Sequence, residues 1–438
     1  MADGAILGQQ ALTVPTGNNA ARPASPAVGM VRYNTETEAL ENYTSNGWLK
    51  VSIQIPTISS TSGTVFTGWP SSLTFTGLNY GSSGTVTATF SGTGLTQTSA
   101  TGTSNSQGTS VTIAVPAAIY NNASTSNQVN VTLANADGGI SAVSALTPSA
   151  LPTGGTITTS GSYRVHRFNS SSNLVTPVNF PTNVTFEFML IAAGGGGGPI
   201  GGGGGAGGYR TGTGTFATNT TYPVVIGGGG NGGSQATQAT SGGNSSIFGI
   251  TATGGGGGGN HVGSDISTPG LSGGSGGGGP DNNNAYPQGS GTPGQGNAGG
   301  AGNPVYPNNP RRGGGGGGIG RTGYSNAEGG HGGDGTANAI LGTSYYWAGG
   351  GGASAYSSGT PGGNGGIGGG GGGSSDQGPG GSAGGSAINA AEAGQNGTNA
   401  PGGAGAANTG GGAGGGGWSS PPIVVRGGSG IAVVRYIL

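Results

Sequence analysis

The sequence predicts an all-β protein that ends in a stack of polyglycine II helices. Three observations predict this fold class. Of 112 glycines in 438 residues, only 19 precede residue 194, which leaves 93 for the last 245 residues. Two apolar, strand-like runs bracket that glycine-rich segment. Before it, short runs of branched and aromatic residues alternate with turn signals, a pattern typical of β-strands.

The composition excludes several classes of protein. Only 5% of the residues are charged and the formal net charge is −1, so we expect no nucleic-acid-binding surface. Cysteine is absent, which excludes disulfides and thiolate metal sites. The sequence contains no apolar run of about 18 residues, so we expect no membrane-spanning helix. The first twenty residues lack a basic start and a long apolar stretch, so we expect no signal peptide.

Residues 1–53 form the first predicted part, a β-hairpin module. The pattern predicts a strand over 28–34 and a hairpin over 39–51. Asn46-Gly47 favours positive φ at both positions, which a type I′ hairpin turn requires. A segment this small does not bury a core by itself. We therefore expect it to serve in attachment and oligomerisation, packed against a copy of itself or another protein.

Residues 54–150 form the second part, which we predict to be a β-sandwich. Val86-Thr87-Ala88-Thr89-Phe90 alternates with period two, as a half-buried strand does. About a hundred residues of such short strands, separated by turn signals, are typical of a sandwich. The strand-like runs are 73–76, 85–90, 111–115 and 129–133.

Residues 151–438 form the glycine-rich third part. Pairing of the apolar run 184–193 with 431–438 would clamp the two ends of the segment together, which a flexible linker does not need. We therefore favour an ordered domain over disorder, although Gly and Pro without a period are typical of disorder. The glycine runs between the clamping strands are 194–198, 201–205, 227–230, 254–259, 276–279, 313–318, 349–352, 368–373 and 410–417.

Runs of glycine have a specific way to form an ordered core. A polyproline II helix has three residues per turn and no internal hydrogen bonds, so its N–H and C=O groups point sideways. Without side chains, neighbouring helices approach closely enough to bond to one another. Each ordered glycine costs roughly 1–2 kcal/mol of chain entropy, which many bonds of about 1 kcal/mol each offset. We therefore predict stacked polyglycine II helices sealed by β-strands, with the residues between runs forming turns at both ends.

The polar residues indicate no enzyme. His166, His261 and His331 lie far apart in the sequence, without the spacing of metal ligands. The acidic residues of the segment show no spacing typical of glycosidases or cation sites; these are Asp281, Glu328, Asp334, Asp376 and Glu392. We therefore expect no catalytic residue, no metal and no cofactor.

Aromatic residues in the loops are the candidate binding residues. Tyr and Trp give large, rigid contact areas beside adaptable Ser, Gly and Asn, as in antibody loops. Alternatively, these rings cover the lattice ends or pack between subunits, and Arg311-Arg312 either pairs with anionic sugars or solvates the stack. The loops are 280–312, 321–328, 340–347 and 353–361, and the candidate receptor-binding residues are Tyr286, Tyr306, Arg311, Arg312, Tyr324, Tyr345, Tyr346, Trp347 and Tyr356.

Each part also resembles a known family. The pattern R-P-x-x-P-x-x-G-x-V-R-Y-N-T over 22–35, with L-E-x-Y and N-G-W after it, resembles a module of bacteriophage tail fibres and other virion proteins. Residues 56–58, 62–63, 73–81 and 129–135 resemble the immunoglobulin-like IPT/TIG domain. Residues 163–168, 190–194 and 427–436 are similar to the borders of the glycine-rich domain of phage tail-fibre proteins, including tip adhesins.

These resemblances imply a structural protein of the virion tail, made in the host cytoplasm. They imply a tail fibre or fibre-tip adhesin that joins other virion proteins through residues 1–53, is a homotrimer, and binds a bacterial surface glycan or outer-membrane protein. The sandwich would be a spacer or a sugar-contacting accessory. The alternatives are a capsid decoration or whisker protein, then a glycan depolymerase or a bacterial surface adhesin.

Overall fold

The computed structural model describes residues 14–51, 54–234, 236–262, 266–281, 287–302, 311–417 and 425–438. Its contacts divide the chain into two compact units, Met1–Ala150 and Leu151–Leu438. The described residues contain β-strands, one short α-helix and two 3₁₀ turns. The predicted all-β fold class is confirmed.

The first sheet of the chain has the strand order β1-β2-β3-β4. The predicted hairpin is present, but the predicted type I′ turn is wrong. Thr44 pairs with Gly47, and of the turn residues only Gly47 has a positive φ, +102°. Ser45 and Asn46, between the paired residues, therefore lack the positive φ angles that a type I′ turn requires. The elements are β1 (Thr16–Gly17), η1 (Asn19–Ala21), β2 (Val31–Asn34), β3 (Ala39–Thr44) and β4 (Gly47–Lys50).

Residues 57–146 form an immunoglobulin-like β-sandwich. One sheet has the order β5-β6-β9 and the other β11-β10-β7-β8. Their facing side chains form one apolar core that includes Leu73, Phe75, Phe90 and Ile113. The alternating run from Val86 to Phe90 buries every second residue, as predicted. The elements are β5 (Thr57–Ser62), β6 (Ser72–Leu78), β7 (Thr85–Ser91), β8 (Thr98–Thr103), β9 (Ser110–Ala114), α1 (Ala117–Tyr120), β10 (Val129–Ala134) and β11 (Ser144–Leu146).

A five-stranded antiparallel sheet opens and closes the second unit. Its order is β12-β13-β24-β15-β16, and β15 pairs with β24 from Phe186↔Tyr436 to Ile191↔Ile431. The predicted clamp between the two apolar runs is therefore confirmed. The strands are β12 (Thr156–Ser160), β13 (Tyr163–Phe168), β15 (Thr185–Ile191), β16 (Tyr209–Thr215) and β24 (Ile431–Tyr436).

Short two-stranded sheets accompany this larger sheet. They pair β14 with β17, β18 with β19, β20 with β21, and β22 with β23. The elements are β14 (Ser172–Val175), β17 (Thr221–Val224), β18 (Ser245–Ile247), β19 (Ile250–Ala252), β20 (His261–Val262), β21 (Ile266–Ser267), η2 (Asn326–Glu328), β22 (Thr336–Asn338) and β23 (Tyr345–Trp347).

The predicted polyglycine II stack fills the rest of this unit, and residues 201–206 show how it is bonded. The N–H of Gly202 donates to the Gly259 carbonyl and that of Gly205 to the Gly256 carbonyl, at 2.9 and 2.8 Å. The same neighbour recurs every third residue, because the helix has three residues per turn. The N–H groups of successive residues therefore donate to three different neighbouring segments, and their carbonyls accept hydrogen bonds from three more. The six neighbouring segments are 256–259, 314–317, 410–413, 195–198, 275–278 and 351–354.

Residues 349–354 repeat this arrangement. Their N–H groups donate to three segments and their carbonyls accept from three others, again at intervals of three residues. Six bonded neighbours around one helix define a hexagonal lattice held by backbone hydrogen bonds. The neighbours here are 368–371, 330–333, 201–204, 412–415, 363–366 and 313–316.

The spacing of the lattice explains the glycine content. A Cβ built on Gly203 would lie 2.0 Å from the carbonyl oxygen of Gly351. At the edge of the lattice, only the residues that face neighbouring helices must be glycine. Gly381 and Gly384 are buried, whereas Ser382 between them is exposed and has a side chain.

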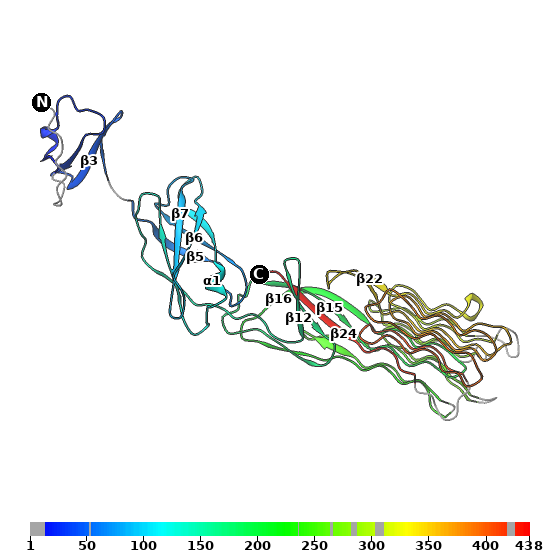
Figure 1. The fold of residues 1–438 in the computed structure, drawn as a ribbon. Coiled ribbons are helices and arrows are strands. Elements are labelled where there is room, and N and C mark those ends of the chain that lie inside the picture. Colours follow the sequence, from blue (N-terminus) through cyan, green and yellow to red (C-terminus); the bar gives the residue numbers. More distant parts are fainter. Residues whose placement is uncertain are drawn as a thin grey trace. The chain divides into compact units, whose positions relative to one another are not determined.

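Turns join the polyglycine helices at two opposite ends (Figure 1). We call the end at β15 and β24 the sheet end and the opposite one the far end. The chain leaves β15, turns first at Pro199-Ile200 at the far end, and returns to β16 at the sheet end. Successive runs alternate in this way, so successive turns alternate between the two ends.

A buried histidine of β13 contacts the closing strand β24. His166 has no exposed surface. Its Nδ1 lies 2.8 Å from the Gly154 carbonyl and its Nε2 lies 3.2 Å from the Tyr436 hydroxyl. A carbonyl only accepts, so Nδ1–H donates to Gly154 and Nε2 accepts from Tyr436. Burial lowers the pKa of His166 to about 4.

The buried His166 makes the stability of the protein depend on pH. The pKa is about 6.5 in an unfolded chain and about 4 in the folded one, so the unfolded chain binds the proton better between these values. The stabilisation is full above pH 6.5 and is lost as the pH falls toward 4. Between pH 6.5 and pH 4.5 we expect the free energy of unfolding to fall by about 2 kcal/mol more in the wild type than in the His166→Gln variant. Urea unfolding at both pH values measures this difference, and equal losses would contradict it.

Candidate functional site

The structure divides the predicted binding residues between different places. Arg311, Arg312 and Tyr356 lie at the far end, next to turns. Tyr345, Tyr346 and Trp347 form β23, at the sheet end. Tyr324 lies between, within the lattice: its N–H donates to His331 and its carbonyl accepts from Gly315. Tyr286 and Tyr306 lie outside the described residues.

Arg311 is the centre of a polar cluster at the far end. Its Nη2 lies 3.4 Å from Oδ1 of Asp281 and 3.5 Å from Nε2 of His261. The guanidinium carbon lies 4.8 Å from the centre of the Tyr356 ring, within cation–π distance. The backbone N–H of Arg311 donates to the Ser357 hydroxyl at 2.8 Å. Four different turns thus contribute to one cluster, which we call the far-end cluster.

Burial governs the charges of the far-end cluster. Asp281 is 1% exposed, and this burial raises its pKa to about 7 although Arg311 acts in the opposite direction. Burial also lowers the pKa of His261 to about 4, and the neighbouring Arg311 adds to the effect. At neutral pH His261 is therefore neutral and Asp281 is near its midpoint. The partly exposed Arg311 and the Tyr356 ring give the cluster a cationic, aromatic surface.

Arg312 belongs to the lattice and is largely buried, and its role as a binding residue stays a prediction. It is 7% exposed, and its Nε–H donates to the Pro361 carbonyl at 3.1 Å. Burial lowers the pKa of this guanidinium. The sequence places Arg311 and Arg312 side by side, but successive residues point to different neighbours, so only Arg311 reaches the surface cluster.

Trp347 is also a candidate binding residue in the sequence. The side chain is fully buried, packs in the core between the sheet and the lattice with Met189 and Val433, and donates its Nε1–H to the Asn338 carbonyl at 3.3 Å. Of the two tyrosines that precede Trp347 in β23, Tyr345 is half-buried and Tyr346 is exposed. Trp347 therefore packs at the junction of the sheet and the lattice.

The part of the chain that forms this lattice matches a known family. The model of a family described as "Glycine-rich domain" matches residues 169–406, which is more than half of the chain. The chain belongs to the glycine-rich domain family.

Other comparisons add little to this assignment. A solved structure of the FN1–FN3 domains of chicken CNTN1 is 11% identical, over 43% of this chain and 69% of that one, with a TM-score of 0.18. At that score the likeness carries no argument. No curated protein matches the chain.

The glycine-rich domain also contains a groove that sequence reasoning missed. It has a volume of about 420 Å³ and lies at the sheet end, between the β15–β16 edge and residues 338–340. Arg435 donates to Oε2 of Glu187 from Nε and Nη2, at 2.9 and 2.7 Å. Its Nη1 donates to the Ala339 carbonyl, and Asn338 donates to the Tyr209 hydroxyl. The predicted strand pairing was the only signal for this site, since Glu187 and Arg435 are 248 residues apart.

Among the described residues, no three His, Asp or Glu side chains lie together as metal ligands would. The helices of this part of the chain are too short or too polar to span a bilayer.

Proposed function

We propose that the protein is a virion structural protein of a bacteriophage, a tail fibre or fibre-tip adhesin that binds the surface of a bacterial host. The observation that carries this proposal is the separation of roles within the glycine-rich domain. Its interior consists of backbone and glycine, whereas chemically diverse side chains lie in turns at the ends. A lattice of this kind holds its turns rigidly, which reduces the entropy lost on binding.

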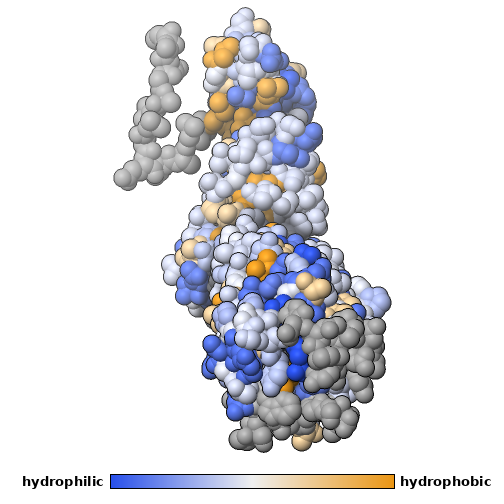
Figure 2. All heavy atoms as spheres, turned by 90° about the vertical axis from the view of Figure 1, so that its right-hand side faces the viewer, coloured by the Kyte–Doolittle hydropathy of each residue, from blue (hydrophilic) through white to orange (hydrophobic). Residues whose placement is uncertain are grey.

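The far end supports the proposal best. The far-end cluster combines an arginine held by an ion pair with a partly exposed tyrosine ring, two residue types enriched where protein surfaces bind strongly. Figure 2 views the molecule toward this end, where the described surface shows hydrophilic patches among near-neutral residues. A cationic and aromatic surface fits a bacterial surface glycan with acidic groups. Several copies on one particle would multiply a modest affinity.

Binding of the labelled full-length protein to whole bacterial cells tests the proposal. We expect saturable labelling of a strain from a diverse panel, which unlabelled protein displaces. Absence of labelling across the panel would favour a capsid decoration or whisker protein. Release of reducing sugars from surface glycans would instead favour a depolymerase.

Two matched double variants locate the binding surface. We expect Arg311→Ala/Tyr356→Ala, at the far end, to lower the apparent affinity at least about tenfold, because truncation of such residues costs above 1 kcal/mol. Arg210→Ala/Tyr346→Ala removes an exposed arginine and an exposed tyrosine of the sheet end. This variant should change the apparent affinity less than about twofold. The measurement is a cell-binding isotherm on variants whose melting temperatures match the wild type. The reverse ranking would place the binding surface at the sheet end.

A further inference from the structure

The module of residues 14–51 is built with its polar residues inside. Four of its residues are buried, namely Arg32, Asn34, Ala39 and Glu41, and only one of these is apolar. An ordinary small domain buries apolar side chains and leaves charged ones in water. The arrangement of this module is therefore the opposite of the usual one.

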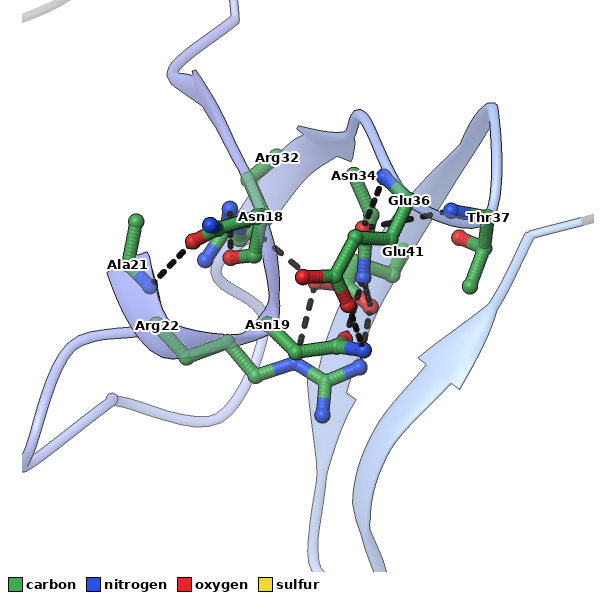
Figure 3. A network of polar contacts seen from close by, with 9 residues as sticks. All are labelled: Asn18, Asn19, Ala21, Arg22, Arg32, Asn34, Glu36, Thr37 and Glu41. Carbon is green, nitrogen blue, oxygen red and sulfur yellow. Dashed lines mark hydrogen bonds and ion pairs between the residues drawn. The ribbon is translucent and has the colours of Figure 1, made fainter.

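A hydrogen-bonded network accounts for the buried side of the sheet (Figure 3). Arg22 donates to both carboxylate oxygens of Glu41, at 3.2 and 2.7 Å. Arg32 lies 3.4 Å from the same carboxylate and donates to the Asn18 carbonyl. Asn34 donates to Glu41 at 3.0 Å. Residues 18–22, which include η1, cover this side of the sheet through these bonds, and no described residue of the module covers the other side.

The open side of the sheet is apolar. Strand register decides which residues lie there: Arg32 pairs with Glu41 on the covered side, so Val31, Tyr33, Leu40 and Asn42 lie on the other. Asn42 pairs with Leu49, which places Leu49, and Val51 two residues later, on the same side. We call this side the open face; it consists of Val31, Tyr33, Leu40, Asn42, Leu49 and Val51.

Among the described residues, the apolar side chains of the open face remain partly exposed. Val31 and Leu40 are 40% and 39% exposed, and Leu49 and Val51 are 48% and 47% exposed. Hydrophobic residues are visible on the surface of this module in the upper part of Figure 2. Large contiguous apolar patches on soluble proteins mark interaction sites.

We infer that the open face is the surface through which copies of this chain associate. A second copy fits because none of the six residues is charged, so two open faces meet without repulsion and without an unpaired buried charge. Apolar sheet faces pack on each other with interdigitating side chains at about 10 Å. An identical face on each copy also gives the closed, symmetric contact that most oligomers use. The inference rests on the proposed function only in that a multivalent adhesin needs several copies.

The molar mass of the full-length protein in solution tests this inference. We expect light scattering after size exclusion to give at least twice the chain mass of 41.1 kDa. Leu40→Lys/Leu49→Lys places two charges on the open face and should return the mass to 41.1 kDa. Both residues are exposed, so we expect the module to keep its fold. An unchanged near-ultraviolet circular dichroism spectrum, to which the Tyr43–Trp48 ring pair contributes, checks this.

A matched control places the same charges elsewhere. Ile140 and Val143 of the sandwich are 62% and 61% exposed, and Ile140→Lys/Val143→Lys should keep the wild-type mass. A monomeric wild type, or a Leu40→Lys/Leu49→Lys variant with unchanged mass, would overturn the inference. The measurement uses no cells: a monomer that labels bacteria refutes the open face alone, and an oligomer that labels none refutes only the proposed function.

Discussion

Gly203→Ala is expected to destabilise the glycine-rich domain by about 3 kcal/mol or more. The added Cβ would lie 2.0 Å from the Gly351 carbonyl oxygen and 2.5 Å from its carbon. Both are backbone atoms of a helix that is itself bonded to six neighbours, so no side chain is able to rotate away. Overpacking of a rigid interior typically costs 1–3 kcal/mol, occasionally more. Thermal and urea unfolding measure the loss.

Gly228→Ala is the matched control for this prediction. Gly228 also lies in a glycine run, but it is exposed, and a Cβ built on it meets nothing within 4 Å. The substitution lowers the entropy of the unfolded chain, so we expect a gain of up to about 1 kcal/mol. Equal effects of the two substitutions would show that the lattice spacing does not require glycine at Gly203.

Trp347→Ala is expected to lower the free energy of unfolding by about 3–5 kcal/mol, the usual cost of removing a large buried aromatic side chain. The ring is fully buried and packs between the sheet and the lattice. Its loss would leave a cavity at the junction and the Asn338 carbonyl without its donor. Cell binding per folded molecule should stay unchanged at a temperature where the variant is folded.

Tyr346→Ala, one residue away, is the control. Tyr346 is 37% exposed, so its truncation should cost less than about 1 kcal/mol. If Trp347→Ala melted like the wild type but lost cell binding, Trp347 would be a binding residue, as the sequence suggested, and not a core residue.

The sequence was enough to predict the all-β fold class and the glycine-rich core. The clamp of β15 and β24 follows from two apolar runs on either side of the glycines, and the lattice follows from what glycine backbones are able to bond. The sandwich strands follow from alternation such as that of Val86 to Phe90.

The arrangement within the lattice was not predictable. All glycine runs present the same backbone surface, so nothing in residues 201–206 selects 314–317 as a neighbour over another run. Segments such as 380–385 also belong to the lattice although Ser382 and Ala383 interrupt their glycines. Because such segments do not read as glycine runs, the sequence does not show how the turns alternate between the two ends of the lattice. Arg311 and Tyr346 are both candidate binding residues in the sequence, although they lie at opposite ends of the lattice.

The burial of individual loop residues depends on the same arrangement. Arg311 and Arg312 are chemically identical neighbours, and only the three-residue period of the helix sends one to the far-end cluster and the other into the lattice. The burial of polar residues in the module of residues 14–51 was likewise not predictable. In the sequence Glu41 and Arg32 look like surface residues, and only the strand register pairs them on the covered side.

Amide hydrogen exchange of the lattice glycines tests the central claim most directly. In the structure, the N–H groups of residues 202–206 and 349–354 donate to backbone carbonyls of neighbouring helices. We expect these amides to be protected as strongly as those of β15 and β24, although they lie in no helix or sheet with ordinary hydrogen bonding. Exchange of these glycines within seconds at neutral pH, as in an unfolded peptide, would contradict a core made of polyglycine II helices.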